Sequence, residues 1–332
     1  MKSDCFYYGT YTPEGFYSLA QKQEFSTDKN LTVNSYSHFL KQRLFSEIKT
    51  ELEKRGYSYI DFRADDRSLG IYSKDAGFRV ADGTYSDTDE DAVILGNAVT
   101  QTAQRCIERR ENEVRRIQRF LSACRYISND MIRIDSENID MMKINRFAAR
   151  MWSSTGGVLK GSIGTEHKRF VTCFTPEGVE LNLNAFDIYC DNVTVVCEKS
   201  GACAARIVDR VRRYALSAGY DVISCICPMN VGRGPEHLII PELKYGIFVC
   251  KHYHKGDFKR SRRVFYGRFL SSSSEQTRHR MDFSMKAYRR LMQEVFFSLE
   301  EIKKCDNELE SLVDNEFADE QIDNILHLLF SS

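Results

Sequence analysis

The sequence predicts an α/β protein with two related domains, and two observations lead to this expectation. First, the string "YTPEGF" at residues 11–16 returns as "FTPEGV" at residues 174–179, 163 positions later. Second, the same offset places Gly56-Tyr57 on Gly219-Tyr220 without a gap. A turn motif can recur by chance, but a register that is kept over this length favours a duplicated domain.

The repeated unit begins with a strand and a helix. "LTVN" (31–34) falls on "TVVC" (194–197), and both are short β-prone runs. The segment after each run has the apolar spacing of an amphipathic helix. The apolar positions are Leu40, Leu44, Ile48 and Leu52 in the first copy and Ile207, Val211, Tyr214 and Ala218 in the second.

A glycine and further strands complete the unit. Gly56 and Gly219 suit the left-handed position after a helix. The β-rich strings "YSYIDF" and "YDVISCIC" follow them. The offset then grows to 169, where "GFRVADGT" (77–84) lies against "GIFVCKHY" (246–253), and an insertion near "NVGRGPEH" accounts for the change.

A strand followed by a helix presents free backbone N–H groups and the positive end of the helix dipole, which favours phosphate. The P-loop, GxxxxGK[ST], adds glycines that wrap the phosphates, a lysine, and a hydroxyl for magnesium. Both loops here lack parts of it. "EKSGACAAR" (198–206) keeps Gly201, but Ala204 and Ala205 stand at the lysine and hydroxyl places. "SYSHFLKQ" (35–42) has Lys41 and Gln42 at these two places and no glycine.

The sequence resembles the bacterial ATPase-like proteins built from two tandem P-loop NTPase domains. The resemblance rests on "GTYTPEGFYSL" at the start, "DGT" (82–84), "FTPEG" (174–178), "HLIIPELKYGIFV" (237–249), "LEEIKKCDNELESL" (299–312) and "QIDNIL" after it. It implies two parallel-sheet, three-layer domains. In that family the loop is typically an intact GxxGxGK[ST], and this chain departs from it in both halves.

We therefore predict two sequential degenerate P-loop-like domains, each with a helical extension. The first covers residues 1–155 with its extension at 92–150, and the second covers 156–332 with its extension at 283–330.

Two charged features suggest partners. Arg109, Arg110, Arg115, Arg116 and Arg119 alternate with glutamates in a helical pattern, which is typical of a solvated helix face. Segment 251–290 has twelve Lys or Arg and three Asp or Glu, whereas 291–332 has eleven acids and two bases. The favoured interpretation is that these segments neutralise each other. The alternative is a nucleic-acid partner on the basic segment.

Two predicted strands carry residues that could bind a metal. Cys225 and Cys227 share a face of one, and Cys250, His252 and His254 share a face of the other, so adjacent strands would gather soft ligands for zinc. The spacing is not a standard zinc pattern, and cysteine is common in buried strands. We predict no metal site.

Composition indicates where in the cell the protein is expected. The 47 basic residues balance the 47 acidic ones, and no apolar run is long enough for a bilayer, so we expect no membrane partner. The N-terminal residues lack the apolar core of a signal peptide, and eleven scattered cysteines are typical of reduced thiols. We expect a cytoplasmic protein, and no motif predicts a catalytic residue.

These patterns favour three functions. The leading one is an ATPase-like protein without hydrolysis that acts as a binding, regulatory or scaffold protein for an unknown protein partner. The first alternative is weak ATP or nucleotide binding with residual ATPase activity, and the second is nucleic-acid binding through 251–290. The residues predicted to hold a phosphate are Lys41, Lys199, Ser200, Gly201 and Arg206.

Overall fold

The computed structural model describes residues 6–20, 25, 27, 29–65, 67–85, 91–251, 253–258, 260–271 and 275–331. The chain divides into two compact units. Unit 1 comprises Met1–Arg119, Cys173–Gly178 and Glu294–Ser332, and unit 2 comprises Phe120–Thr172 and Val179–Gln293. None of the described helices is both long and apolar enough to cross a membrane.

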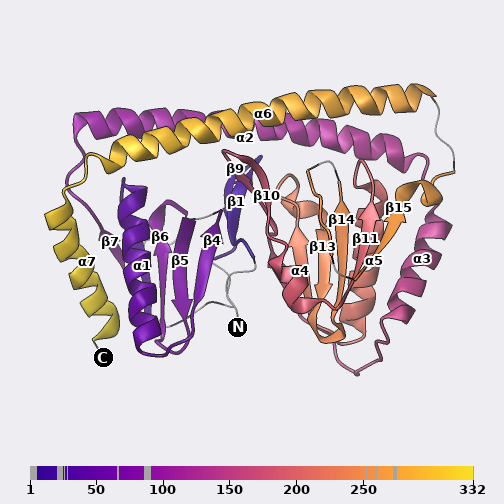
Figure 1. Ribbon diagram of the computed structural model, residues 1–332, viewed down its shortest axis with the longest axis horizontal. Coiled ribbons are helices and arrows are strands. Elements are labelled where there is room, and N and C mark those ends of the chain that lie inside the picture. Colours follow the sequence, from indigo (N-terminus) through magenta and orange to yellow (C-terminus); the bar gives the residue numbers. More distant parts are fainter. Residues whose placement is uncertain are drawn as a thin grey trace. The chain divides into compact units, whose positions relative to one another are not determined.

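Unit 1 contains a five-stranded sheet in the order β4-β5-β6-β3-β7 (Figure 1). Its strands are β3 (Lys29–Asn34), β4 (Ile60–Ala64), β5 (Arg67–Ser73), β6 (Phe78–Asp82) and β7 (Ala92–Ile94). Strand β3 is parallel to both of its neighbours, β6 and β7. Strand β5 is antiparallel to both β4 and β6.

Unit 2 contains a six-stranded sheet in the order β15-β11-β14-β13-β12-β8. Its strands are β8 (Glu166–Arg169), β11 (Asn192–Cys197), β12 (Val222–Ile226), β13 (Pro235–Ile240), β14 (Tyr245–Cys250) and β15 (Ser261–Phe265). Strand β11 is parallel to β14 and β15, and β13 is antiparallel to β12 and β14. Strand β8 extends the sheet beside β12 and is parallel to it.

The two sheets share one topology. Strands β7, β3, β6, β5 and β4 match β15, β11, β14, β13 and β12 in order, and each neighbouring pair has the same relative direction. The α/β class is as predicted. The expected parallel sheets are instead mixed, because the short connections from β4 to β5 and from β5 to β6 allow only antiparallel neighbours.

The first helix of each unit has the predicted apolar stripe. Helix α1 (His38–Lys54) buries Leu40, Leu44, Ile48 and Leu52, and helix α5 (Ala202–Ser217) buries Ile207 and Val211. The glycines after the two helices, Gly56 and Gly219, have φ of 71° and 91°, as the left-handed position requires.

Helices cover one face of the unit 1 sheet. Helix α1 packs there with α7 (Asn315–Phe330) against Val33, Ile71 and Val80. On the other face the Phe62 ring contacts the rings of Tyr8 and Phe25 at centroid distances of 5.1 and 4.9 Å. Unit 1 is therefore not the expected three-layer arrangement, because an aromatic N-terminal segment takes the place of a helical layer.

Unit 2 carries helices on both faces of its sheet. Helices α5 and α3 (Met141–Ser154) share one core with Leu238 and Ile247. The short helix α4 (Asn184–Tyr189) places Phe186 edge-on to Phe248, the neighbour of Ile247 in β14. Because successive side chains of a strand point to opposite faces, α4 covers the face opposite α5.

Two long helices, α2 (Gln101–Ser136) and α6 (Glu275–Glu310), run antiparallel. In unit 1, Arg109 pairs with Glu308 at 2.6 Å and Arg116 with Glu294 at 2.8 Å. In unit 2, Asp130 pairs with Arg280 at 2.9 Å. Arginines of the predicted solvated helix face therefore form ion pairs with the neighbouring helix.

The units differ from the sequential domains 1–155 and 156–332 that we predicted. The second half of α2 and all of α3 lie in unit 2, whereas the end of α6 and α7 lie in unit 1. Helix α7 belongs there because Ile322, Ile325 and Leu329 are buried in the core that surrounds α1. The extension 283–330 is thus divided between the units.

The two TPEG strings form matching hairpins. Strands β1 (Gly9–Thr12) and β2 (Gly15–Ser18) flank one turn, and β9 (Thr172–Thr175) and β10 (Gly178–Leu181) flank the other. The hydroxyl of Thr12 donates to the carbonyl of Gly15 at 2.7 Å, and that of Thr175 donates to the carbonyl of Gly178 at 3.2 Å. Residues 173–178 belong to unit 1, where the Cys173 thiol donates to the carbonyl of Gly9 at 4.0 Å.

The placement of α7 in unit 1 can be tested by Ile322→Ala. Removing this buried side chain should lower the free energy of unfolding by about 2–5 kcal/mol. Hydrogen exchange should quicken in β3 and β6 of unit 1. The exposed Leu328 of the same helix is the control, and Leu328→Ala should cost under about 0.5 kcal/mol. Loss of protection confined to β11 and β14 would contradict the assignment.

Candidate functional site

The loop between β11 and α5 is filled by the chain's own side chains. Only residues 198–201 separate the strand from the helix. The backbone N–H groups of Cys203 and Ala204 donate to the two carboxyl oxygens of Glu198, at 3.0 Å each. The N–H of Ala202 donates to the hydroxyl of Ser200 at 3.2 Å. The free N–H groups of the first helical turn, which would otherwise attract a phosphate, are thereby satisfied.

Glu198 is buried beside a lysine. Burial raises the pKa of its carboxyl group to about 7, although Lys251 and the N–H groups of Ala204 and Cys203 act in the opposite direction. Lys251 follows β14, the strand next to β11, and forms an ion pair with Glu236 of β13. Burial disfavours the charge on Lys251, but Glu236 beside it raises the pKa above its usual value. Charged side chains from the end of β11, from β13 and from the end of β14 thus meet next to helix α5.

The other predicted phosphate ligands of this loop do not converge. Lys199 is exposed and pairs with Asp282 at 3.5 Å. Arg206 donates to the carbonyl of Ala202 at 2.6 Å and to the hydroxyl of Ser136 at 3.1 Å. Gly201 takes the left-handed conformation at the start of α5, with φ of 92°. The loop therefore keeps its glycine for backbone geometry.

The cavity beside this loop is small. Ser200, Gly201, Arg233, Glu236 and Lys251 are among its lining residues, and its volume is about 60 Å³. Ligand pockets for drug-sized molecules have roughly 300–1,000 Å³. The cavity has room for a few waters rather than for a nucleotide.

In unit 1 the predicted lysine is held in a buried ion pair. Lys41 lies in the first turn of α1, and only residues 35–37 separate that helix from β3. Its ammonium group lies 2.7 Å from Oδ1 of Asp82 and donates to the hydroxyl of Thr84 at 2.8 Å. Burial lowers the pKa of Lys41, while Asp82 opposes this shift. Both side chains are almost completely inaccessible to solvent.

The two loops place their charges differently. At the offset of 163, Lys41 corresponds to Ala204. Val33 pairs with Asp82 and Val196 with Val249, so the counterpart of Asp82 is Val249 and the predicted offset of 169 is wrong for these strands. Unit 1 thus has the cation on the helix and the anion at the end of the neighbouring strand. Unit 2 has the cation just after the neighbouring strand and the anion, Glu198, in the loop. The sequence-based prediction missed this difference, because Asp82 and Lys251 follow Lys41 and Glu198 by some forty to fifty residues.

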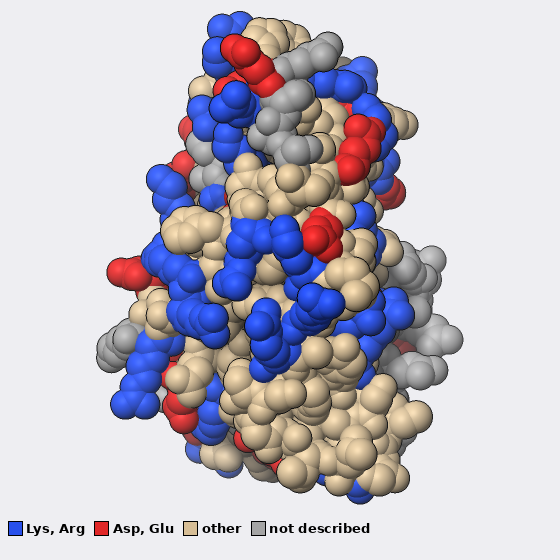
Figure 2. Space-filling model, turned by 90° about the vertical axis from the view of Figure 1, so that its right-hand side faces the viewer, with Lys and Arg blue, Asp and Glu red and all other residues tan. Residues whose placement is uncertain are grey.

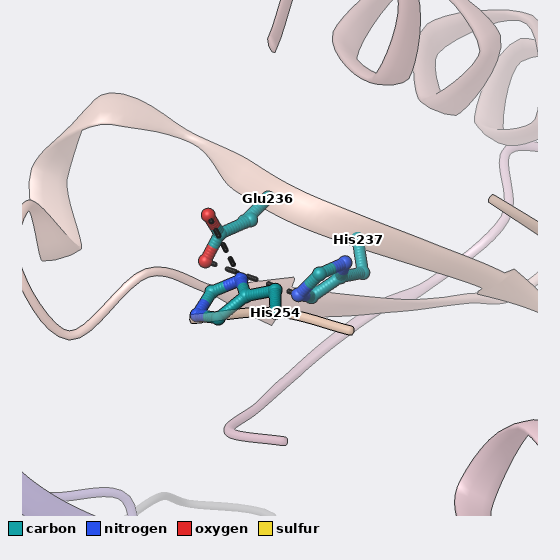
Figure 3. A group of neighbouring side chains, drawn as sticks. All are labelled: Glu236, His237 and His254. Carbon is teal, nitrogen blue, oxygen red and sulfur yellow. Dashed lines mark ion pairs between the residues drawn. The ribbon is translucent and has the colours of Figure 1, made fainter. Parts of the chain in front are cut away.

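Glu236, His237 and His254 form a buried cluster whose candidate ligand atoms all lie within 4.8 Å of one another (Figure 3). Nδ1 of His254 is 3.5 Å and Nε2 of His237 is 3.9 Å from the Glu236 carboxylate. However, Nδ1 of His237 accepts the backbone N–H of Val249 at 2.9 Å, so a neutral His237 carries its proton on Nε2. That atom then has no lone pair for a metal, and Lys251 already neutralises Glu236.

The cysteines considered for zinc are not gathered. Cys225 is in β12 and Cys250 is in β14, and β13 lies between these strands, so the expectation of adjacent strands is wrong. Cys227 lines the small cavity beside α5, and His252 lies outside the described residues. None of the cysteines that the structure describes forms a disulfide.

The ion pairs seen in the described residues of segments 251–290 and 291–332 go to other parts of the chain or stay within one segment. Acids of the second segment pair with Arg43, Arg109, Arg110 and Arg116 of unit 1. Basic residues of the first pair locally with Glu236, Asp257 and Asp130. Lys259 lies outside the described residues.

Comparisons of the chain with protein-family models, with curated proteins and with solved structures returned no match. The function is therefore inferred from the chemistry of the chain's own residues.

Substituting Lys41→Met should destabilise unit 1 strongly. The change leaves the Asp82 carboxylate buried without its counterion, which typically costs about 3–5 kcal/mol. The exposed Lys54 at the end of the same helix is the control, and Lys54→Met should cost under about 1 kcal/mol in a urea titration. Equal costs for the two variants would contradict a structural role for the Lys41–Asp82 pair.

Glu198 should make stability depend on pH. Its pKa is about 7 in the folded chain against 4.5 for an ordinary glutamate, so between these values the folded state holds a proton that the unfolded state has lost. The free energy of unfolding should therefore fall as pH rises from 4.5 to 7, by on the order of 3 kcal/mol from this group. Glu198→Gln should remove that slope in urea titrations at several pH values. Glu180→Gln, at an exposed site of the same unit, should leave it unchanged.

Proposed function

We propose that the chain is a binding protein that uses a P-loop-like α/β scaffold without hydrolysing nucleoside triphosphates. The observation that carries the proposal is the Glu198 carboxyl group, which accepts the N–H groups of Cys203 and Ala204 at the N-terminus of α5. A phosphate would need these same donors. The chain thus supplies its own acidic group at the place where a nucleotide phosphate would bind.

Phosphoryl transfer needs more than a helix N-terminus. P-loop NTPases use a lysine on the β- and γ-phosphates and a hydroxyl on Mg²⁺. Unit 2 has Ala204 and Ala205 at these places. Unit 1 has Lys41, but Asp82 and Thr84 occupy its ammonium group. Neither loop has the length or the glycines to wrap a triphosphate.

The closed loops favour a regulatory or scaffold role. In unit 1, Lys41 of the first helix pairs with Asp82 at the end of β6. In unit 2, Glu198 accepts the N–H groups at the start of α5, next to the charge of Lys251 after β14. The charges that could serve catalysis therefore hold helix and sheet together. A partner would then bind elsewhere on the two units. The bacterial P-loop ATPase-like family remains the origin that we propose for the repeated topology.

Nucleotide turnover tests the proposal directly. The purified chain with Mg²⁺ and ATP should release no phosphate above the rate of the protein-free buffer, and a calorimetric titration with ATP and ADP to millimolar concentration should give no binding heat. Magnesium-dependent turnover that Lys41→Met abolishes, in a variant shown to be folded, would overturn the proposal.

A gain-of-binding variant sharpens the same test. Glu198→Ala removes the internal carboxyl group and leaves the N–H groups of Cys203 and Ala204 without their acceptor. Inorganic phosphate should then slow hydrogen exchange at the start of α5 in Glu198→Ala but not in the wild type. Glu198→Gln is the matched control, because its amide oxygen still accepts a hydrogen bond. Equal protection by phosphate in the wild type would contradict a filled loop.

A further inference from the structure

A groove with an arginine rim lies in unit 2 between α3 and the edge strand β15, away from the loop of Glu198. Its volume is about 520 Å³. Phe147 and Met151 of α3 and Tyr245 of β14 contribute its apolar surface, and Arg260 and Arg262 line it from the β15 side. We call this feature the arginine groove.

Basic side chains continue beyond the groove. Figure 2 shows the side of the molecule on which α3 and β15 lie in Figure 1, and Lys and Arg side chains cover much of its middle with few acidic side chains among them. The exposed basic residues of α3, β15 and the adjoining turns are Lys143, Arg146, Arg150, Arg260, Arg262, Arg263 and Arg268. All but one are arginines.

Five of these arginines form no ion pair among the described residues, and one of the five, Arg268, lies over the rings of Phe147 and Phe269. Lys143 pairs with Asp140, and Arg263 with Asp257. In the part of the chain that the structure describes, Arg146, Arg150, Arg260 and Arg262 form no ion pair. Their charge is therefore available to a ligand.

We propose that the arginine groove binds a single strand of nucleic acid through its phosphates. Guanidinium groups present planar paired donors that match phosphate oxygens, whereas lysine acts only as a point charge. Arg260 and Arg262 line the groove from the β15 side, and α3, whose Phe147 and Met151 line the other side, also carries the exposed Arg146 and Arg150. Such a series of cations along a groove fits a linear chain of negative charges. A groove of this kind favours one extended backbone over a flat lipid surface.

The competing explanation is that the arginines protect the edge strand β15 from aggregation. Charged side chains on an edge strand prevent it from pairing with another sheet. That explains Arg262 on β15, but it does not explain the arginines of α3, which lie on a helix. It also predicts no affinity for phosphates. Nucleic-acid binding by the arginine groove does not depend on the closed loops. A failure to bind nucleic acid would leave the proposed lack of hydrolysis intact, and ATP hydrolysis would leave the groove proposal intact.

Fluorescence anisotropy with a labelled fifteen-nucleotide oligothymidine provides the test. With about four phosphates neutralised, log K should fall with log salt concentration at a slope of about −3. Arg260→Glu combined with Arg262→Glu should weaken binding at least tenfold at low salt and make the slope shallower by about 1.4. Lys168→Glu combined with Arg169→Glu, on the opposite edge strand β8, is the matched control and should change the affinity less than twofold.

Arg260→Lys combined with Arg262→Lys separates recognition from folding. It keeps the edge charged, so it should fold and still lose several-fold in affinity because the guanidinium fork is gone. Circular dichroism should show the same melting curve for all variants. Absence of binding, a flat salt response, equal losses for the two edge strands, or tighter binding to a duplex or to anionic vesicles would each overturn the proposal.

Discussion

A buried charge at the first helix of each sheet must be neutralised within the chain, and the neighbouring strands supply the neutralising group. In unit 1 the pair is Lys41 and Asp82, and in unit 2 Lys251 lies between Glu198 and Glu236. An uncompensated buried charge is far more costly than a buried pair, so neither partner can vary alone. This requirement holds the first helix of each unit close to the neighbouring strands. In unit 2 it also occupies the backbone N–H groups at the start of α5 that a phosphate would use.

The same constraint explains how two repeats with little sequence in common keep one topology. The order and direction of five strands agree, while the buried charges occupy different positions in the two units. Residues in contact are coupled energetically, so one viable arrangement can replace another only if its members change together. The alanines at 204 and 205 fit this account, because a lysine at 204 would face the Glu198–Lys251–Glu236 group from the helix.

Local features were predictable from the sequence, and long-range ones were not. The spacing of Leu40, Leu44, Ile48 and Leu52 specifies a helix, and Gly56 and Gly219 specify its end, because these depend on near neighbours along the chain. Strands β5 and β13 run antiparallel to their neighbours because the connections on either side of them are short. These connections had no clear boundary in the sequence, so their length could not be predicted. The partners of Lys41 and Glu198 come from strands some forty to fifty residues away, so periodicity could not reveal them. The membership of α7 in unit 1 is hidden for the same reason.

The return of α7 to unit 1 has a consequence for the order of events during synthesis. The last segment of unit 2 ends at Gln293, whereas unit 1 also includes the later segment from Glu294 onward, which contains α7. The unit encoded first is therefore finished last, which reverses the usual sequence of co-translational folding. Until α7 has been synthesised, Ile322, Ile325 and Leu329 cannot cover the apolar stripe of α1 with which they share a core.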